Sequence, residues 1–167
     1  AYRVRLPNLG PSWDGCRVAV ISDLQIGMWG NNLKTVCLVV DEIRQVQPNM
    51  VLILGDFIYY GEKETDERIA TAVNLLKPLT DDGLPVIAVL GNRDYSIASY
   101  SETTIDVARA KRLANALREI GIIVLRNHAA ALYTPAGEPL YVIGVDSLMA
   151  KRSWPRVSYY QVPRDAP

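Results

Sequence analysis

The sequence predicts an α/β fold built mostly from parallel βαβ units. Short apolar runs alternate with longer segments of helical period, which is the pattern of strands joined by crossover helices. Two of the runs are continuous in apolar residues, as expected for strands of a sheet that is covered on both faces. Polar residues or glycine follow the runs abruptly, so the strands are expected to end in loops at one edge of the sheet.

The first βαβ unit is predicted from residue 17 to residue 54. Arg17–Ser22 (RVAVIS) is rich in β-branched residues and predicts a strand. Asn32–Val46 predicts a helix, because its apolar residues recur every three or four positions, and Pro48 ends it. Met50–Leu54 (MVLIL) predicts the second strand, since five consecutive apolar residues do not suit a half-exposed one.

The rest of the chain continues the alternation and then changes to an antiparallel pattern. Asp66–Leu76 and Thr104–Ile120 predict helices around a third strand, Pro85–Leu90, and Gly121 is placed to end the second of these helices. A fourth strand follows, and then two strands whose connection contains Pro135 and Gly137, which predicts a hairpin. These strands are expected over Ile122–Leu125, Ala129–Tyr133 and Leu140–Val145.

Length and composition predict one domain over residues 1–167. The chain has 167 residues, 49% of them apolar, which suffices for a core. It begins without Met and ends after a Pro- and Tyr-containing stretch, so we expect a C-terminally incomplete domain. The longest apolar runs have five residues, against roughly 18 for a membrane span, which predicts a soluble segment. Its two cysteines are expected to be buried free thiols.

Charge and histidine content exclude several functions. Eighteen basic and 18 acidic residues leave no net charge, so the chain has no electrostatic signal for nucleic acid. The single histidine, His128, excludes sites built from several histidines and is expected to be a surface or packed strand residue.

Three strand ends carry polar motifs. They read SDLQIG from Ser22, GDFIYYG from Gly55 and GNRD from Gly91. Because parallel strands end at one edge, Asp23, Asp56 and Asn92 are expected to meet there. Each residue alone also suits a turn or a helix cap. Carboxylates that are brought together require compensating cations. The three motifs taken together therefore favour a divalent metal site for Mn, Fe or Zn.

The three motifs resemble those of the calcineurin-like metallophosphoesterases, and the similarity runs over about residues 6–146. The resemblance implies an α/β sandwich, two divalent metal ions in the complete domain and hydrolysis of phosphoester or pyrophosphate bonds. The C-terminal His motifs of the family have no counterpart in this sequence, so metal binding by this segment alone is expected to be weak or absent. The resemblance also implies that Asp23 binds the first metal, Asp56 bridges both and Asn92 binds the second. Asp94 matches the acid that orients the neighbouring catalytic side chain.

Two positions depart from the family pattern. Gln25 stands where a metal-binding His is usual, and its amide oxygen is expected to be a weaker ligand. Tyr59 is an alternative ligand, because Gly55-Asp56-x-x-Tyr59 resembles the purple acid phosphatases, although wall or core packing suits it too. Arg93 replaces the His that contacts the phosphate; it can bind phosphate but cannot act as a general acid, which favours pyrophosphate substrates. An ion pair with Asp94 or another acid is the alternative for Arg93.

Finer similarity to a bacterial, membrane-anchored branch of the family implies a lipid-linked or nucleotide-sugar phosphate substrate and membrane association through a segment outside this chain. Two other functions stay open: a catalytically degenerate binding module, favoured by Gln25 and Arg93, and a nuclease of the same family, which the zero net charge disfavours. Asp146 is expected at a turn. Loop aromatics suit either a substrate wall or anchoring, namely Trp29, Tyr59, Tyr60, Tyr95 and Tyr100.

Overall fold

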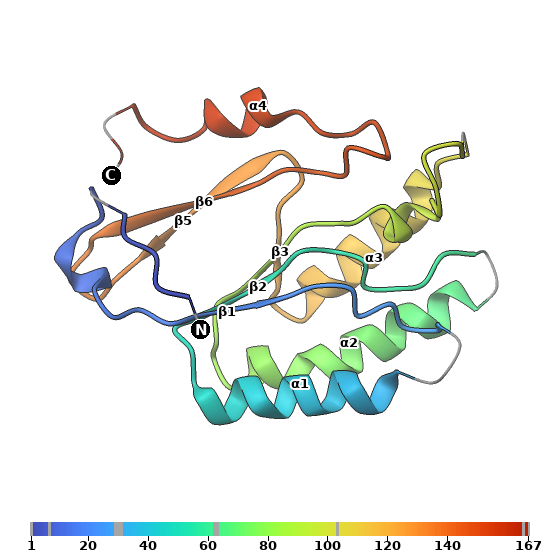
Figure 1. Ribbon diagram of the computed structural model, residues 1–167, viewed down its shortest axis with the longest axis horizontal. Helices are drawn as coiled ribbons and strands as arrows, with labels where there is room; N and C mark the ends of the chain where they lie inside the picture. The colour runs from blue at the N-terminus through green and yellow to red at the C-terminus, as the bar shows by residue number, and fades with distance from the viewer. Residues whose placement is uncertain are drawn as a thin grey trace.

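The protein is layered, with helices on one face of a parallel sheet and a hairpin on the other. The computed structural model describes residues 2–6, 8–28, 32–61, 64–102, 104–164 and 166. Figure 1 shows α1 (Leu33–Val46) and α2 (Thr65–Asp81) below the sheet, and α3 (Val107–Glu119) packs next to α2 and β4. Above the sheet lie the hairpin and the short helix α4 (Pro155–Tyr159).

The main sheet has four parallel strands in the order β1-β2-β3-β4. They are β1 (Val18–Ile21), β2 (Met50–Ile53), β3 (Val86–Ala88) and β4 (Ile123–Val124). Sequential strands are neighbours throughout, so each crossover helix returns the chain by one position, and the carboxyl ends of β1, β2 and β3 lie side by side. The α/β class and the parallel βαβ units predicted from the sequence are confirmed.

The main core lies between this sheet and the three helices. The inward face of α1 is the one that its periodicity predicts, with Val36, Val40 and Ile43 buried. Helix α2 runs five residues beyond the predicted end at Leu76, through Pro78 to Asp81. Leu79 is fully buried in the core, and this burial offsets the helical hydrogen bond that Pro78 cannot make.

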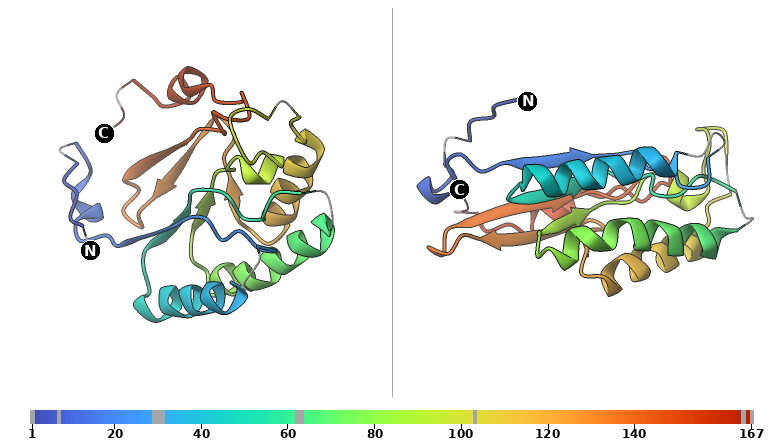
Figure 2. Two further views of the ribbon diagram at one scale, coloured as in Figure 1. Left: turned by 45° about the vertical axis from the view of Figure 1, so that its right-hand side comes forward. Right: turned by 90° about the horizontal axis from the view of Figure 1, so that it is seen from below.

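The antiparallel pair β5 (His128–Tyr133) and β6 (Pro139–Gly144) lies on the second side of the sheet (Figures 1 and 2) but leaves β1 uncovered there, since Val18 and Val20 are 43% and 55% exposed. Gly144 permits this approach, because a Cβ there would lie 2.2 Å from the Leu125 side chain. At the hairpin turn, Glu138 accepts hydrogen bonds from the backbone and hydroxyl of Ser12 in the 3-10 helix η1 (Pro11–Trp13). The predicted hairpin is confirmed, whereas helix α4 has no counterpart among the predicted elements.

Two smaller expectations have different outcomes. Both cysteines are unpaired, but Cys16 is only half-buried and Cys37 is exposed on α1, so the prediction of buried thiols was wrong. Among the residues described, no helix has the length and apolar character needed to cross a membrane.

Candidate metal centre

The loops that follow β1 and β2 are joined to each other beyond the ends of the strands. The amide of Asp23 donates to the Gly55 carbonyl at 3.1 Å, and that of Gln25 donates to the Asp56 carbonyl at 2.8 Å. Ile26 extends the pairing through its amide to the carbonyl of Phe57 at 2.9 Å. These bonds place the first two motifs side by side at the carboxyl edge of the sheet, where the sequence predicts them.

The loops after β2 and β3 touch through two glycines. A Cβ on Gly55 would lie 2.3 Å from the Gly91 amide nitrogen, and a Cβ on Gly91 would lie 2.0 Å from Oδ1 of Asp56. Gly55 also has a φ of +94°, which side chains rarely adopt. The second and third motifs therefore approach as closely as their backbones allow, because a side chain at Gly91 would collide with Asp56 and one at Gly55 with the backbone of Gly91.

Asp94 connects the second and third motifs by hydrogen bonds. Its carboxylate is fully buried, and Oδ2 accepts from the amides of Asp56 at 3.0 Å and Gly91 at 2.9 Å. Oδ1 accepts from the amides of Phe57 at 2.9 Å and Ile58 at 3.2 Å. Burial raises the pKa of Asp94 to about 7, although these N–H donors favour the charged form. Asp94 thus contacts the backbone of two of the three loops that carry predicted metal ligands.

Asp56 and Asp23 form the acidic part of the site. Burial raises the pKa of Asp56 above its usual range, while the backbone N–H of Arg93, which donates to its Oδ1 at 3.0 Å, lowers it. The negative charge of Asp23 raises it further. The Asp23 carboxylate accepts hydrogen bonds from the hydroxyl of Ser22 at 2.6 Å and from the side-chain Nε2 of Gln25 at 2.9 Å. Asp56 is half-buried and Asp23 is exposed, and two interacting carboxylates of this kind are a setting that a divalent cation stabilises.

The two carboxamides can complete an oxygen donor set. Asn92 donates through Nδ2 to the Ile97 carbonyl at 2.7 Å, so its oxygen is the atom that it can offer to a ligand. In Gln25 the nitrogen is likewise engaged, by Asp23. Within the described part of the chain, no group of three or more His, Cys, Asp or Glu side chains could hold a metal ion. The donors are therefore two carboxylates with two amide oxygens, a set that suits hard divalent ions better than thiophilic ones.

Arg93 lies against two tyrosine rings. Its guanidinium carbon is 4.9 Å from the ring centroid of Tyr60 and 5.6 Å from that of Tyr59, and the two rings are themselves 4.5 Å apart. The alternative role for Arg93 was an ion pair with Asp94. Arg93 lies against the tyrosine rings instead, and the Asp94 oxygens accept hydrogen bonds from backbone amides. Arg93 and the two tyrosines therefore form a cationic and aromatic surface beside the acidic groups.

Two arginines, from helices α2 and α3, donate hydrogen bonds to the loop that carries the two tyrosines. Arg109, fully buried in the first turn of α3, donates to the carbonyls of Tyr59 and Gly61. Arg68 of α2 donates to the carbonyl of Tyr59 at 3.3 Å. Burial lowers the pKa of Arg109, as expected for a cation whose partners are neutral carbonyls. Sequence reasoning missed Arg109, because an arginine within an amphipathic helix normally indicates the solvent face.

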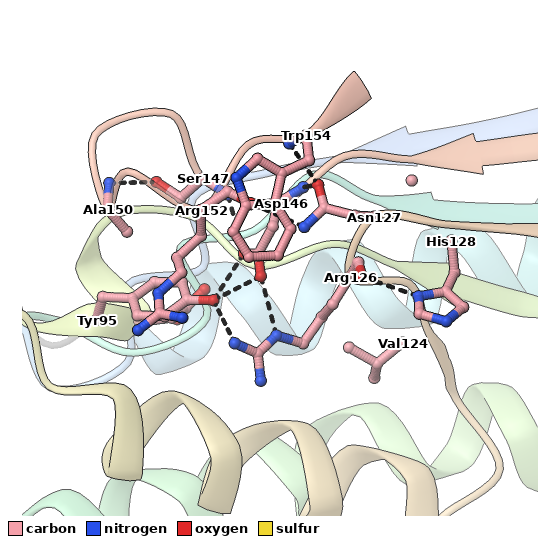
Figure 3. Close-up of polar contacts among 12 residues, drawn as sticks. Tyr95, Val124, Arg126, Asn127, His128, Asp146, Ser147, Ala150, Arg152 and Trp154 are labelled. Atoms are coloured by element: carbon pink, nitrogen blue, oxygen red, sulfur yellow. Dashed lines mark hydrogen bonds and ion pairs between the residues drawn. The ribbon is translucent and has the colours of Figure 1, made fainter. Parts of the chain in front are cut away.

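Several other sequence expectations can now be placed. His128 is exposed at the start of β5, in agreement with the surface alternative. Tyr95 is fully buried and therefore anchors its loop rather than forming a substrate wall, whereas Tyr100 is 82% exposed. Trp29 lies outside the described residues. Asp146, expected at a turn, is buried, and Figure 3 shows its side chain bonded to Tyr95 and Arg126.

Comparisons with known proteins identify a family. A family model described as calcineurin-like phosphoesterase matches residues 16–165. A search of the curated proteins gives no match. Among solved structures, the chain is similar to phosphopantetheinyl hydrolase (PptH) of Mycobacterium tuberculosis, with 23% identity, 77% of this chain and 42% of that chain covered, and a TM-score of 0.46.

It is also similar to the protein TT1561 of Thermus thermophilus, with 15% identity, 79% of this chain and 49% of that chain covered, and a TM-score of 0.51. This second similarity shows a shared fold. The chain spans less than half the length of either protein.

Proposed function

We propose, from the premise that this chain belongs to the calcineurin-like phosphoesterase family, that it carries the metal-binding part of a hydrolase of phosphoester or pyrophosphate bonds. The observation that carries the proposal is the meeting of three strand-end motifs at one edge of the sheet. Backbone bonds join the first motif to the second, and Asp94 joins the second to the third. Bonds between loops at Asp23 and Asp56, together with Asp94 beside Asn92, bring the loops of the three predicted ligands together, which supports the proposal.

The donor set would supply part of the coordination of a pair of divalent ions. Asp56, between the other two motifs, would bridge the ions, with Asp23 and Gln25 on one side and Asn92 on the other. An oxygen-only set favours Mn²⁺ over Zn²⁺ among the candidate metals. When bound, such ions polarise phosphoryl oxygens and lower the pKa of a coordinated water.

Arg93 would bind the phosphate that undergoes hydrolysis. Its guanidinium stays protonated at every relevant pH, so it can hold a phosphate by two hydrogen bonds but cannot protonate a leaving group. Leaving groups that are already stable anions, such as the phosphate released from a pyrophosphate, suit this chemistry. The rings of Tyr59 and Tyr60 beside Arg93 offer an apolar surface for the rest of the substrate. Lipid-linked or nucleotide-sugar phosphates are the substrates that we propose.

Calorimetric titration with Mn²⁺ tests the metal site. We expect the wild-type chain to bind Mn²⁺ and Asp56→Asn to bind it at least ten-fold more weakly, because the bridging charge is lost. Asp41→Asn, which removes an exposed carboxylate on α1, is the matched control and should bind like wild type. Equal affinity in wild type and Asp56→Asn would refute the assignment of this site.

Relative hydrolysis rates test the role of Arg93. A histidine at position 93 can donate a proton, so Arg93→His should raise the rate on an alkyl phosphomonoester relative to the rate on a pyrophosphate diester. Arg112→His, on the exposed side of α3, is the control. An unchanged ratio of the two rates in Arg93→His would contradict the proposed preference.

A catalytically degenerate binding module is the second candidate. It is favoured by the amide of Gln25 at the first metal position and by the lack of a His, Cys, Asp and Glu cluster among the described residues. The two candidates differ in metal binding. Two Mn²⁺ ions per chain with hydrolysis of a phosphoester support the enzyme, whereas phosphate binding without metal supports the module.

A further inference from the structure

A closed cluster of three side chains lies behind the candidate metal centre. Tyr95 ends the 3-10 helix η2 (Arg93–Tyr95), Arg126 follows β4 and Asp146 follows β6 (Figure 3). The Tyr95 hydroxyl donates to Asp146 and lies 2.7 Å from both carboxylate oxygens. Arg126 donates through Nε to Asp146 at 2.9 Å and through Nη2 to the Tyr95 hydroxyl at 2.7 Å. Each member therefore contacts the other two.

Two members of the cluster are shielded from solvent, whereas the side chain of Arg126 is 23% exposed, and neighbouring residues bond to Asp146. Tyr95 is fully buried and Asp146 is 5% exposed. The amide of Ser147 donates to Asp146 at 2.9 Å, and Asn127 accepts from the amide of Asp146 at 3.3 Å. Burial, and then the bond to Asp146, raise the pKa of Tyr95, so its hydroxyl stays protonated and donates. Buried ionic groups with several partners hold a defined geometry.

Tyr95 connects this cluster directly to the predicted metal ligands. Its backbone amide donates to the Asn92 carbonyl at 3.1 Å. Its neighbour Asp94 accepts hydrogen bonds from the backbone of the second and third motifs. Its own carbonyl accepts from the amide of Asp106, the N-cap of α3. Tyr95 therefore belongs to the turn on which Asn92 and Asp94 lie, and its side chain ends in the cluster.

We propose that Asp146 and Arg126, acting through the Tyr95 hydroxyl, position the Asn92–Asp94 turn and thereby set the affinity of the site for its divalent ion. The inference rests on the proposed function. Asp146 and Arg126 are positioning residues in this account, because their side-chain bonds go to Tyr95, to one another and to neighbouring backbone. Partners that orient ligands from outside the coordination sphere typically alter metal affinity by 10- to 100-fold.

Tyr95→Phe is the direct test, because it removes the hydroxyl and keeps the ring in the core. We expect Mn²⁺ affinity, measured by calorimetric titration, to fall about ten-fold. Tyr141→Phe, which removes a hydroxyl from β6, is the matched control and should keep the wild-type affinity. Amide hydrogen exchange of the metal-free protein should become faster in residues 91–96 of Tyr95→Phe and stay unchanged there in Tyr141→Phe.

The outcomes separate this inference from the proposed function. If the wild type binds Mn²⁺ and Tyr95→Phe binds it equally well, the inference is overturned and the proposed function is not. This holds even if Tyr95→Phe melts at a lower temperature. Wild type that binds no Mn²⁺ would overturn both. If Tyr95→Phe does not yield folded protein, Arg126→Lys decides by the same measurement, since lysine retains a positive charge but cannot contact Asp146 and Tyr95 through separate nitrogens.

Discussion

Substitution of Gly55 by alanine isolates the contribution of the closest backbone contact in the site. The new Cβ would lie 2.3 Å from the Gly91 amide nitrogen, and ordinary contact requires about 3.5 Å. One of the two loops must therefore move by about 1 Å. Overpacking of this kind typically costs about 1–3 kcal/mol, and a side chain in the left-handed region costs about 1–2 kcal/mol more.

Gly121→Ala is the control that separates the two costs. Gly121 has a φ of +89°, close to the +94° of Gly55, but a Cβ there would meet its nearest neighbour, Thr80, at 3.8 Å. Gly121→Ala should lower the free energy of unfolding by about 1–2 kcal/mol from backbone strain alone. Gly55→Ala should lower it by about 2–5 kcal/mol, measured by urea denaturation of the metal-free proteins.

Metal affinity gives the second measurement on the same pair. Displacement of Gly55 or Gly91 moves Asp56, so Gly55→Ala should bind Mn²⁺ at least ten-fold more weakly than wild type. Gly121→Ala should retain wild-type affinity, because Gly121 lies at the other end of α3. Equal losses of stability in the two variants, or unchanged Mn²⁺ affinity in Gly55→Ala, would refute the argument from close approach.

Three further predictions concern single groups. Because burial raises the pKa of Asp56 and the metal binds its charged form, Mn²⁺ affinity should decrease as pH falls and begin to do so at a higher pH than for an ordinary carboxylate, in titrations across pH. Arg109→Lys should lower the free energy of unfolding by about 2–4 kcal/mol, since a lysine cannot hold two carbonyls as the guanidinium does, and chemical denaturation measures this loss. The hydrogen bond from Arg44 lowers the pKa of Asp82. The ionised Asp82 therefore stabilises the fold at pH values above its unfolded-state pKa, and this stabilisation is lost as the pH falls through the lowered pKa. Arg44→Ala should return the Asp82 pKa toward its ordinary value in an NMR titration, with little effect on stability at pH 7.

The sheet and the meeting of the motifs could be predicted from the sequence because they depend on local pattern and on general topology. The apolar runs at β2 and β3 and the polar residues after them place Asp56 and Asn92 correctly at one edge. The family resemblance read from the three motifs is confirmed by the family model. The lipid-directed branch and the individual roles of the site residues stay predictions.

What could not be predicted depends on contacts between distant segments. Asp94 was assigned to the orientation of a neighbouring side chain, but its carboxylate contacts four backbone amides, and no spacing in the sequence shows where those amides point. Tyr95 and Asp146 are 51 positions apart, so nothing local marks their bond. Helix α2 passes Pro78 because Leu79 has a buried position beyond it, which is a tertiary effect.

Backbone strain gives an independent reason to regard this edge as a functional site. Of the eight non-glycine residues with positive φ in the described part of the chain, three are the predicted metal ligands Asp23, Gln25 and Asp56, at 58°, 44° and 56°. Strain of this kind persists where the surrounding structure overdetermines the conformation. Here the bonds from the Asp23 and Gln25 amides to the second loop, and from the Asp56 amide to Asp94, supply that constraint. Glycine would adopt these angles without strain, so the side chains at the three positions carry an energetic cost, which supports the proposed ligand role.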